Sequence, residues 1–485
     1  MAGFEKIQQR EDGLKRKLSP QQMTMIALGG AIGTGLFLGS KMAIGLAGPS
    51  VIVSYAIGGL IGLMLMGSLS EMTVTHSTSG SFGAYAEHYV GPLAGFLVRY
   101  MYWSCIVLAV GTEVTAIGDY MKFWFPDVPS VLWVVLFSAA LIGANAMNVK
   151  VFGSLEYWFS SIKVFAIIAF ILLAAYLVFG TDRSGTGFHN YTAEGGFFSH
   201  GFSGMWFGVI VAIFSYLSIE MIAVAAGEAE NPGEAVKKAF KATTARLFLF
   251  YILTLALILA LSPVSGIMEG GSPFVTVMED AGIPFAGDLI NFVVIIAALS
   301  AMNSQLYIST RMMFSLARAK DAPSVLGRIR PNGTPLNALI LSSGGIAVAT
   351  IAYVMNPDTA FTFMMSISMF GAMFTWMMIF VTHLFFRRQM KRDGRELAFR
   401  VPFSRVGAIA GAGLMIAIMF STLATDAFDM TLVFGAPTVV LTTVLYFVVR
   451  KRRPAAIGAE DDAEVVPADS DRPEDVADSS RPSGV

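Results

Sequence analysis

Long apolar stretches separated by short polar connections dominate the pattern of this chain. Eight stretches contain no Asp, Glu, Lys or Arg, and they cover 18–40, 42–70, 131–149, 247–268, 289–310, 336–357, 406–425 and 430–449. Weaker apolar segments lie near 93–121, 155–180, 204–230 and 359–386. About 20 apolar residues are enough for a helix to cross a bilayer, so the pattern predicts an all-α integral membrane protein with twelve membrane-spanning helices.

The first apolar stretch carries an unusual concentration of glycine, because residues 29–35 read Gly-Gly-Ala-Ile-Gly-Thr-Gly. Glycine weakens a helix, and a bilayer tolerates irregular backbone only where it is buried in protein or lines a cavity. We therefore expect a discontinuous first helix. Close packing of small residues between helices remains the alternative interpretation. The stretch is too long for a cleaved signal peptide and lacks a small-residue cleavage site.

A second break is predicted in the sixth segment, where residues 214–220 read Phe-Ser-Tyr-Leu-Ser-Ile-Glu. Breaks in the first and sixth spans occupy corresponding places in two halves of five helices. This arrangement is typical of inverted-repeat transporters, which bind their substrate where the two broken helices meet. We expect repeat one at about 18–180, repeat two at about 204–386, and two extra helices at about 406–450.

The charge distribution predicts the orientation in the membrane. Charged residues make up 14% of the chain and hydrophobic residues 55%, whereas about a quarter of an ordinary soluble protein is charged. If the amino terminus is cytoplasmic, only Lys41, Lys122 and Arg183 among the Lys and Arg of the connecting loops fall outside. Such a bias predicts a multi-pass protein of the plasma membrane with both termini, including the segment 1–17, in the cytoplasm.

In the carboxy-terminal segment 451–485, the residues from Pro454 onward include nine acidic and two basic residues and no aromatic residue, so we expect a disordered cytoplasmic tail. The basic cytoplasmic face should bind anionic lipid and not nucleic acid. A single cysteine, Cys105, excludes an internal disulfide, and the five histidines are scattered. We therefore expect no metal and no cofactor. The oligomeric state is not indicated by the sequence.

Several motifs resemble those of the bacterial amino acid permeases of the amino acid-polyamine-organocation superfamily, over about residues 14–450. The motifs lie at 18–19 with 29–39, 84–87, 123–126, 148–153, 156–164 and 228–232. The resemblance implies a fold of two inverted five-helix repeats plus two extra helices. It also implies proton-driven uptake of an amino acid.

An amino acid zwitterion needs donors for its carboxylate and acceptors for its amine, and a broken helix supplies both. The freed amides of Gly33, Thr34 and Gly35 begin the second half of helix one, where the helix dipole favours an anion. The resemblance implies that the substrate amine binds freed backbone carbonyls, namely those of Ile32, Phe214 and Leu217. Phe214, more than Tyr216, is also a candidate gate, although core packing is the alternative.

Lys163 stands out because residues 151–181 contain one other charged residue, Glu156. A buried ammonium is costly, so we expect Lys163 to face helix one and donate to carbonyls near Gly30 or Ala31. The resemblance assigns this lysine to the place that a sodium ion occupies in sodium-coupled relatives. Burial disfavours its charged form, so it could gain a proton from outside and lose it inside. Snorkelling to the headgroups is the alternative.

The remaining candidates are carboxylates and one polar stripe. Glu220 follows the second break, and the resemblance puts Glu113 at the side-chain end of the pocket. Either residue could shape specificity or relay protons. For Glu71 and Glu156 we expect an ion pair or a helix cap near the cytoplasmic side. The stripe could face the pocket or join helices, and it comprises Ser300, Asn303, Ser304 and Gln305.

Other classes of protein fit the sequence less well. An intramembrane enzyme needs a nucleophile or metal constellation, and no such motif is present. A channel would show a continuous polar pore, and a sensor would carry a folded soluble domain. Within the transporters, an amino acid exchanger is the alternative to a proton symporter. We expect small neutral or aromatic amino acids as substrates.

Overall fold

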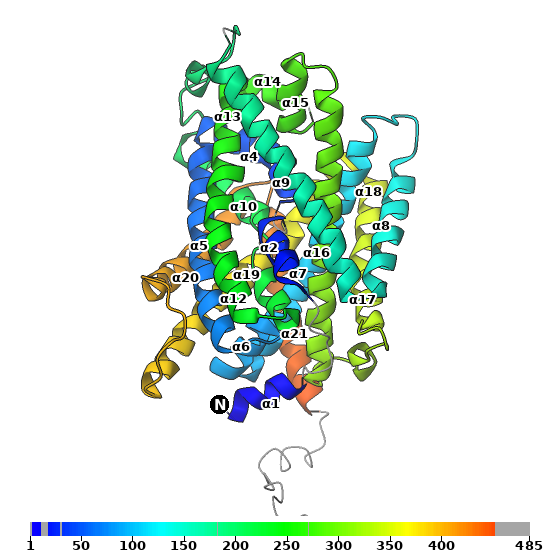
Figure 1. Cartoon of the computed structure of the whole chain (residues 1–485), viewed down its shortest axis with the longest axis vertical. Coiled ribbons are helices and arrows are strands. Elements are labelled where there is room, and N and C mark those ends of the chain that lie inside the picture. Colours follow the sequence, from blue (N-terminus) through cyan, green and yellow to red (C-terminus); the bar gives the residue numbers. More distant parts are fainter. Residues whose placement is uncertain (1, 11–17, 30–31, 182, 270, 452–485) are drawn as a thin grey trace, which may run out of the picture.

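The computed structural model describes residues 2–10, 18–29, 32–181, 183–269 and 271–451, and these residues form helices with no strand among them (Figure 1). The acidic tail predicted to be disordered lies almost wholly outside the described residues. Within them, an all-helical membrane protein is confirmed. An isolated bridge between Leu18 and Ala229 is the sole extended pairing in this part of the chain.

The helices of the first half alternate between long spans and short connecting pieces. They are α1 (Ala2–Arg10), α2 (Pro20–Gly29), α3 (Thr34–Phe37), α4 (Gly39–Ala47), η1 (Gly48–Ser50), α5 (Val51–Thr75), α6 (Ser81–Tyr89), α7 (Pro92–Met121), α8 (Ser130–Met147), α9 (Val149–Phe179) and η2 (Phe188–Tyr191). Local sequence explains two of these boundaries. The Asn148 side chain accepts hydrogen bonds from two amides at the start of α9, and Pro92 occupies the first position of α7, where no amide donor is needed.

The second half also alternates between long helices and short connecting pieces, and its second span contains a π-helical turn. Its elements are α10 (Gly201–Ser215), α11 (Met221–Ala225), η3 (Ala226–Glu228), α12 (Pro232–Arg246), the π-helical turn η4 (Leu247–Leu253), α13 (Thr254–Leu261), α14 (Val264–Glu269), α15 (Pro273–Asp280), α16 (Ala286–Arg318), η5 (Ser324–Gly327), α17 (Leu336–Ser342), α18 (Gly344–Met355) and α19 (Pro357–Arg392). Three further elements close the described chain, namely α20 (Ser404–Ser421), η6 (Thr422–Ala424) and α21 (Asp429–Lys451).

Nine helical stretches of the described chain are long and apolar enough to cross a membrane. One of them, Thr34–Thr75, joins two predicted spans, which the turn at Gly48–Ser50 separates. Two shorter apolar helices, Gly201–Ser215 and Leu249–Leu261, belong to the sixth and seventh predicted spans. Twelve spans and the inverted repeat therefore stay predictions, because interrupted helices do not reach spanning length on their own.

Three long helices form the core of the bundle. Helix α7 packs against both α16 and α19, and 78% of the most apolar window of each of the latter two is buried within the protein. In α21 the corresponding share is 11%, so few residues of this helix are buried within the protein. A helix that is apolar all round and little buried is typical of a lipid-facing position.

Both predicted breaks occur within the described residues. Helix α2 ends at Gly29 and helix resumes at Thr34, while α10 ends at Ser215 and helix resumes at Met221. The two breaks touch, because the Ser215 hydroxyl donates a 2.6 Å hydrogen bond to the carbonyl of Gly35. A Cβ atom on Gly35 would lie 2.7 Å from the Ser215 Cα. Only glycine allows this close approach of the two backbones.

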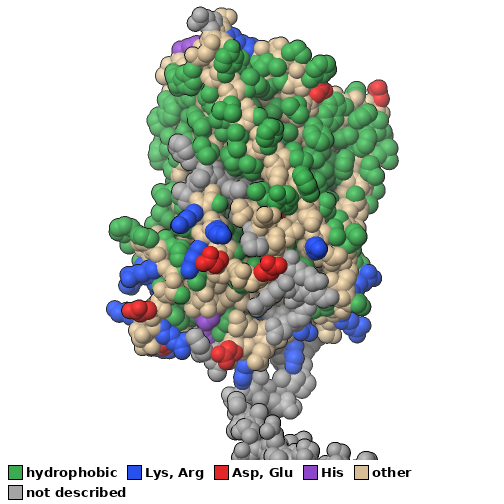
Figure 2. Space-filling view, in the orientation of Figure 1, with side chains coloured by type: hydrophobic (Ala, Val, Ile, Leu, Met, Phe, Trp, Pro, Cys, Tyr) green, Lys and Arg blue, Asp and Glu red, His purple; other side chains and the backbone are tan. Residues whose placement is uncertain are grey.

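The two ends of the bundle differ in charge. Helix α1 lies at one end, here named the α1 end, and α14 and α15 lie at the opposite end, the α15 end (Figure 1). On the face drawn in Figure 2, Lys and Arg side chains gather toward the α1 end, and hydrophobic side chains cover most of the remainder. This arrangement matches a surface divided between a lipid-facing band and a basic polar face.

Candidate functional site

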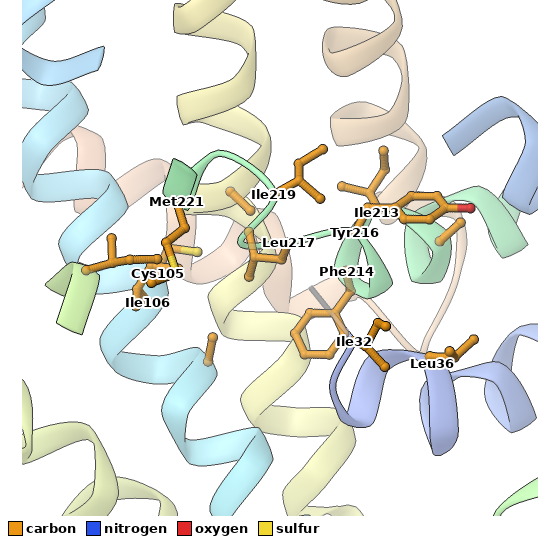
Figure 3. Close-up of a cluster of buried hydrophobic side chains, with 14 of the residues drawn as sticks. Ile32, Leu36, Cys105, Ile106, Ile213, Phe214, Tyr216, Leu217, Ile219 and Met221 are labelled. Atoms are coloured by element: carbon orange, nitrogen blue, oxygen red, sulfur yellow. The ribbon is translucent and has the colours of Figure 1, made fainter. Parts of the chain in front are cut away.

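The candidate site lies where the two breaks meet. Figure 3 shows Ile32 of the first break beside the ring of Phe214 of the second, with Leu217 nearby. The backbone around Ser215 is held by tyrosines, since Tyr251 donates to its carbonyl over 3.0 Å and the Tyr55 and Ser215 hydroxyls are 2.8 Å apart. These contacts keep the interrupted backbone in protein and away from lipid, as a break at this depth requires.

The amino end of α3 faces a carboxyl group. Gly33 is extended (φ −134°, ψ −159°), and its carbonyl accepts the amide of Leu36 over 3.1 Å. The amide of Thr34 donates to Glu113 Oε2 over 3.3 Å. A carboxyl oxygen therefore already lies where the amides of residues 33–35 were predicted to bind the carboxylate of a substrate.

Glu113 reaches this place from α7 and is 2% exposed. Gln305 of α16 donates to its second oxygen over 3.3 Å, and a Cβ on Gly33 would lie 3.2 Å from that oxygen. The resemblance put Glu113 at the side-chain end of the pocket. In the structure its carboxyl group contacts the first break itself.

Lys163 faces helix one, as the sequence predicted. Its Nζ donates to the carbonyl of Ile32 over 2.9 Å and to the Ser300 hydroxyl over 2.7 Å, and the side chain is 0% exposed. The carbonyls of Gly30 and Ala31, named as acceptors from the sequence, lie outside the described residues. The carbonyl of Ile32 therefore accepts a hydrogen bond from the lysine, and a carbonyl oxygen can accept a second hydrogen bond.

The backbone at the second break forms an internal hydrogen bond that the sequence did not suggest. The amide of Leu217 donates to the carbonyl of Phe214 over 3.1 Å, so this carbonyl is only partly free for a ligand. Ser218 adopts the left-handed region (φ 77°), which is uncommon for a residue other than glycine. The Phe214 ring is 4% exposed and lies edge-on to Phe361 at 6.5 Å. Its role as a gate stays a prediction.

Glu220 supports this turn. Its Oε1 accepts the Ser218 amide over 3.2 Å and the Tyr102 hydroxyl over 2.5 Å, and its Oε2 accepts the Trp376 indole N–H over 3.3 Å. Tyr102 belongs to α7 and Trp376 to α19. These contacts anchor the left-handed turn to the core helices. They favour a positioning role for Glu220, and its predicted part in proton transfer remains a prediction.

The polar stripe of α16 joins helices. Glu156 accepts hydrogen bonds from Ser300 over 2.6 Å, Asn303 over 3.2 Å and Ser160 over 3.0 Å. The helix cap predicted for Glu156 is wrong, because Glu156 is the eighth residue of α9. The three donors named here are neutral, and the ion pair expected for Glu156 stays a prediction. One signal was present in the sequence. Glu156 and Lys163 are seven residues apart and so lie on one face of a helix.

Ion pairs tie the helices together at the α1 end. Glu71 binds Arg387 over 2.5 Å and His383 over 2.7 Å, which confirms the ion pair expected for Glu71. Glu228 binds Arg311 over 2.8 Å, with both side chains almost fully buried. Removing one partner of such a buried pair costs about 3–5 kcal/mol, so these contacts stabilise the packing of the helices at this end of the bundle.

Helix α1 adds a contact that the sequence did not reveal. Phe4 is 1% exposed and stacks on His76 with ring centroids 4.1 Å apart. Arg10 and Arg99 both bind Glu87 over 2.8 Å. Burial raises the pKa of Glu87, but the two guanidinium groups outweigh it and lower the pKa to about 2. The spacing of Phe4 and Ile7, both buried on α1, was the available signal.

Over the described part of the chain, no three His, Cys, Asp or Glu side chains are grouped so that they could hold a metal ion. The predicted absence of a metal stays a prediction for the whole chain. Cys105 is buried and forms no disulfide.

The chain matches the family model described as amino acid permease over residues 22–454. It is 39% identical to the uncharacterized amino acid permease YtnA of Bacillus subtilis (strain 168), over 82% of this chain and 86% of that protein. It is 36% identical to the gamma-aminobutyric acid permease of the same organism, over 92% and 96%. It is 38% identical to the aromatic amino acid transport protein AroP of Escherichia coli (strain K12), over 80% and 85%.

These relatives bear the names of permeases or transport proteins, and such proteins move solutes without changing them chemically, so the chain is a transporter and not an enzyme. Because the family model spans nearly the whole described bundle and the relatives match most of the chain, it belongs to the amino acid permease family.

Proposed function

We propose that the protein is a secondary active transporter that imports an L-amino acid across the plasma membrane together with a proton. The observation that carries this proposal is the 2.9 Å hydrogen bond from Lys163 Nζ to the carbonyl of Ile32. A buried ammonium attached to the first break binds that carbonyl more strongly when charged than when neutral. Proton binding can therefore bias the position of helix one, because a ligand shifts an equilibrium by its difference in affinity for the two states.

The substrate carboxylate binds the amides of residues 33–35, and its amine lies by the carbonyls of Ile32, Phe214 and Leu217. The contact between Thr34 and Glu113 limits how the substrate carboxylate can bind. Two ionised carboxylates cannot share one donor without strong repulsion, so Glu113 must move away or bind a proton as the substrate enters. Substrate binding and proton binding are then linked at this second position as well.

Transport by alternating access requires each end of the bundle to open in turn. We assign the α1 end to the cytoplasm because Lys and Arg gather there (Figure 2). We assign the closing of that end to the ion pairs of Glu71, Glu87 and Glu228, which join helices there. Release of the substrate into the cell requires these ion pairs to separate, and their re-formation accompanies the return of the empty transporter.

We propose a neutral amino acid as substrate, either small or aromatic. Backbone groups of the two breaks recognise the amine and carboxylate that every amino acid has. Glu113 already binds Thr34 and Gln305, and it is the carboxylate we place at the pocket, so little negative charge remains for a cationic side chain. Relatives named for gamma-aminobutyric acid and for aromatic amino acids support this proposal, because both kinds of amino acid carry no net charge at neutral pH.

Proteoliposomes distinguish symport from exchange of one amino acid for another. A screen of radiolabelled neutral amino acids identifies the substrate, and an inward proton gradient is then imposed on vesicles that contain no internal amino acid. A symporter accumulates the label and loses this accumulation when an ionophore collapses the gradient. Uptake that requires internal amino acid and ignores the gradient identifies an exchanger and overturns the proposal.

A further inference from the structure

A directed chain of hydrogen bonds connects Lys163 to Glu156 through Ser300. Lys163 Nζ donates to Ser300 Oγ over 2.7 Å, and Ser300 Oγ donates to Glu156 Oε1 over 2.6 Å. All three side chains are 0% exposed. The hydroxyl accepts from the ammonium and donates to the carboxylate, so both hydrogen bonds point from the lysine toward the glutamate.

The chain of bonds also runs toward the α1 end of the bundle. Glu156 and Lys163 are seven residues apart on α9, which places the glutamate about 10 Å nearer to the amino end of the helix. That amino end lies beside the start of α2, since a Cβ on Gly153 would be 2.9 Å from side-chain atoms of both Leu18 and Gln22. A proton that passes from Lys163 to Glu156 therefore moves toward the side that we assign to the cytoplasm.

Few other groups near this path can exchange a proton. Helices α2, α8 and α13, which pack against α9, contain no titratable side chain. From the other neighbouring elements, Glu113 on α7 interacts electrostatically with Lys163, and the remaining titratable groups are engaged elsewhere. Those groups are Tyr307 and Arg311, which bind Glu228, and Tyr251, which binds the carbonyl of Ser215. At the two ends of α16, Asp288 accepts from the Trp124 indole N–H and Arg318 donates to the carbonyl of Arg10.

We propose that Glu156 is the group that takes the proton from Lys163 during transport, with the Ser300 hydroxyl as the relay between them. The proposal rests on the proton symport proposed above. In the step, the Lys163 ammonium passes a proton to Ser300 Oγ while the Ser300 hydroxyl passes its own proton to Glu156 Oε1. The products are a neutral amine, an unchanged hydroxyl and a carboxylic acid, and no further reactant is needed.

The transfer has a mechanical consequence for the first break. The charged lysine holds the carbonyl of Ile32, and loss of its charge weakens that hydrogen bond. Glu156 keeps its remaining donors, Asn303 and Ser160, in both protonation states, since a carboxylic acid retains acceptor capacity. The proton transfer therefore loosens helix one without removing the contacts between α9 and α16.

A cavity at the α1 end offers a route for the proton to leave. It has a volume of about 550 Å³ and lies between the starts of α2 and α9. Its lining includes Gln22, Lys150, Ser154 and Tyr157, and the last two flank Glu156 along the chain. The polar lining suits water, which accepts the proton from Glu156 when movement of α9 turns its carboxyl group toward the cavity.

The test uses the full-length protein in proteoliposomes and three substitutions around one carboxyl oxygen. Glu156→Gln removes the proton acceptor, and Ser300→Ala removes the relay. Ser160→Ala is the matched control, because Ser160 donates to the same Glu156 oxygen but has no place in the path. Two rates are compared for each variant: accumulation driven by a proton gradient, and exchange of internal for external amino acid at equal pH. A pH-sensitive dye inside the vesicles reports proton entry.

We expect Glu156→Gln and Ser300→Ala to lower gradient-driven accumulation by about tenfold or more, since loss of a proton-transfer group has effects of this size or larger. Exchange should remain within about twofold of wild type, because it requires no net proton release. Ser160→Ala should retain both activities, and Ser300→Thr, which keeps the hydroxyl, should recover proton entry. Normal accumulation in Glu156→Gln or Ser300→Ala, or equal impairment in Ser160→Ala, overturns the relay.

Failure of the proposed symport gives a different result. Wild-type protein that shows exchange but neither accumulation nor proton entry contradicts symport, and the relay falls with it. If Glu156→Gln does not fold, judged by size-exclusion chromatography, Glu156→Asp and Ser300→Ala carry the test. Glu156→Asp keeps an ionisable group and should keep proton entry at a reduced rate, whereas complete loss in Glu156→Asp with normal coupling in Ser300→Ala contradicts the path.

Discussion

The backbone amide of Thr34 lies 3.3 Å from the Glu113 carboxyl oxygen, although the two residues are 79 positions apart in the chain. The amide belongs to the break in helix one, and the carboxyl group comes from the core helix α7. An internal carboxyl group therefore occupies the place that we propose for the carboxylate of a free amino acid. Under this proposal, competition between the two carboxyl groups makes a site built of backbone groups responsive to protons.

The first prediction concerns the charge of Glu113. Glu113→Gln keeps an oxygen for the Thr34 amide but removes the negative charge, so the order of preference among substrates should change without uniform loss of binding. Relative affinities should shift by about tenfold for some amino acids, which corresponds to about 1.4 kcal/mol. Thermal shift of the purified protein with a panel of amino acids measures this. An unchanged order would place Glu113 outside the site.

The second prediction concerns Lys163. Lys163→Ala and Lys163→Gln should abolish accumulation against a gradient and leave some substrate binding, because Lys163 is assigned to the break and not to the substrate. Lys163→Arg should also fail, since a guanidinium does not release its proton at physiological pH. Uptake and thermal shift are measured on the same preparations. Normal proton-driven accumulation in any of the three variants would exclude the coupling role.

The third prediction concerns the glycines of the first break. Gly33→Val and Gly35→Val should abolish the binding of every substrate equally. A side chain on Gly33 would meet Ala301 at 2.8 Å and Glu113 at 3.2 Å, and one on Gly35 would meet the Ser215 backbone at 2.7 Å. Thr34→Ser is the mild control, because its amide remains. The thermal shift caused by substrate is the measurement, and a wild-type shift in the valine variants would return these glycines to a packing role.

The fourth prediction concerns pH and the docking of α1. Burial, with a contribution from His88, lowers the pKa of His76 from 6.5 to about 4, so the docked state favours neutral His76. When α1 leaves, Phe4 uncovers His76 and its pKa returns toward 6.5. Docking is therefore fully stable above about pH 6.5 and weakens progressively as the pH falls toward 4.

A fluorophore on Gln9→Cys in a Cys105→Ser background tests this docking. Gln9 is exposed on α1, so the label should not disturb the packed face. Fluorescence anisotropy should fall as the pH is lowered from 7.5 to 5, and Phe4→Ala should show low anisotropy at every pH. A value that does not depend on pH in the parent would contradict the link between His76 and docking.

The fifth prediction concerns orientation. Cysteines placed at Thr186 and Gly271 should react with a membrane-impermeant thiol reagent in intact cells, and one placed at Gly394 should react only after lysis. Cys105 is 1% exposed and should stay unreactive in both conditions. Its replacement by Ala provides a clean background. The reverse labelling pattern would place the α1 end outside the cell.

Hydropathy, glycine density and the position of one lysine predicted much of the fold and of the candidate site from the sequence. Apolar stretches predicted the long helices, and the glycines of residues 29–35 predicted the interruption that follows Gly29. Lys163 was singled out because a buried charge must find polar partners. These features depend on a residue and its immediate neighbours, so they can be read along the chain.

Tertiary structure alone decided which groups meet. Glu113 contacts Thr34 across 79 positions, and Ser300 contacts Glu156 across 144. The left-handed turn at Ser218 and the docking of Phe4 on His76 likewise depend on distant helices. Hydropathy places each helix in the membrane but does not determine its rotation or its neighbours, because packing of many side chains sets both at once. The partners of a buried polar group therefore become visible only in the folded bundle.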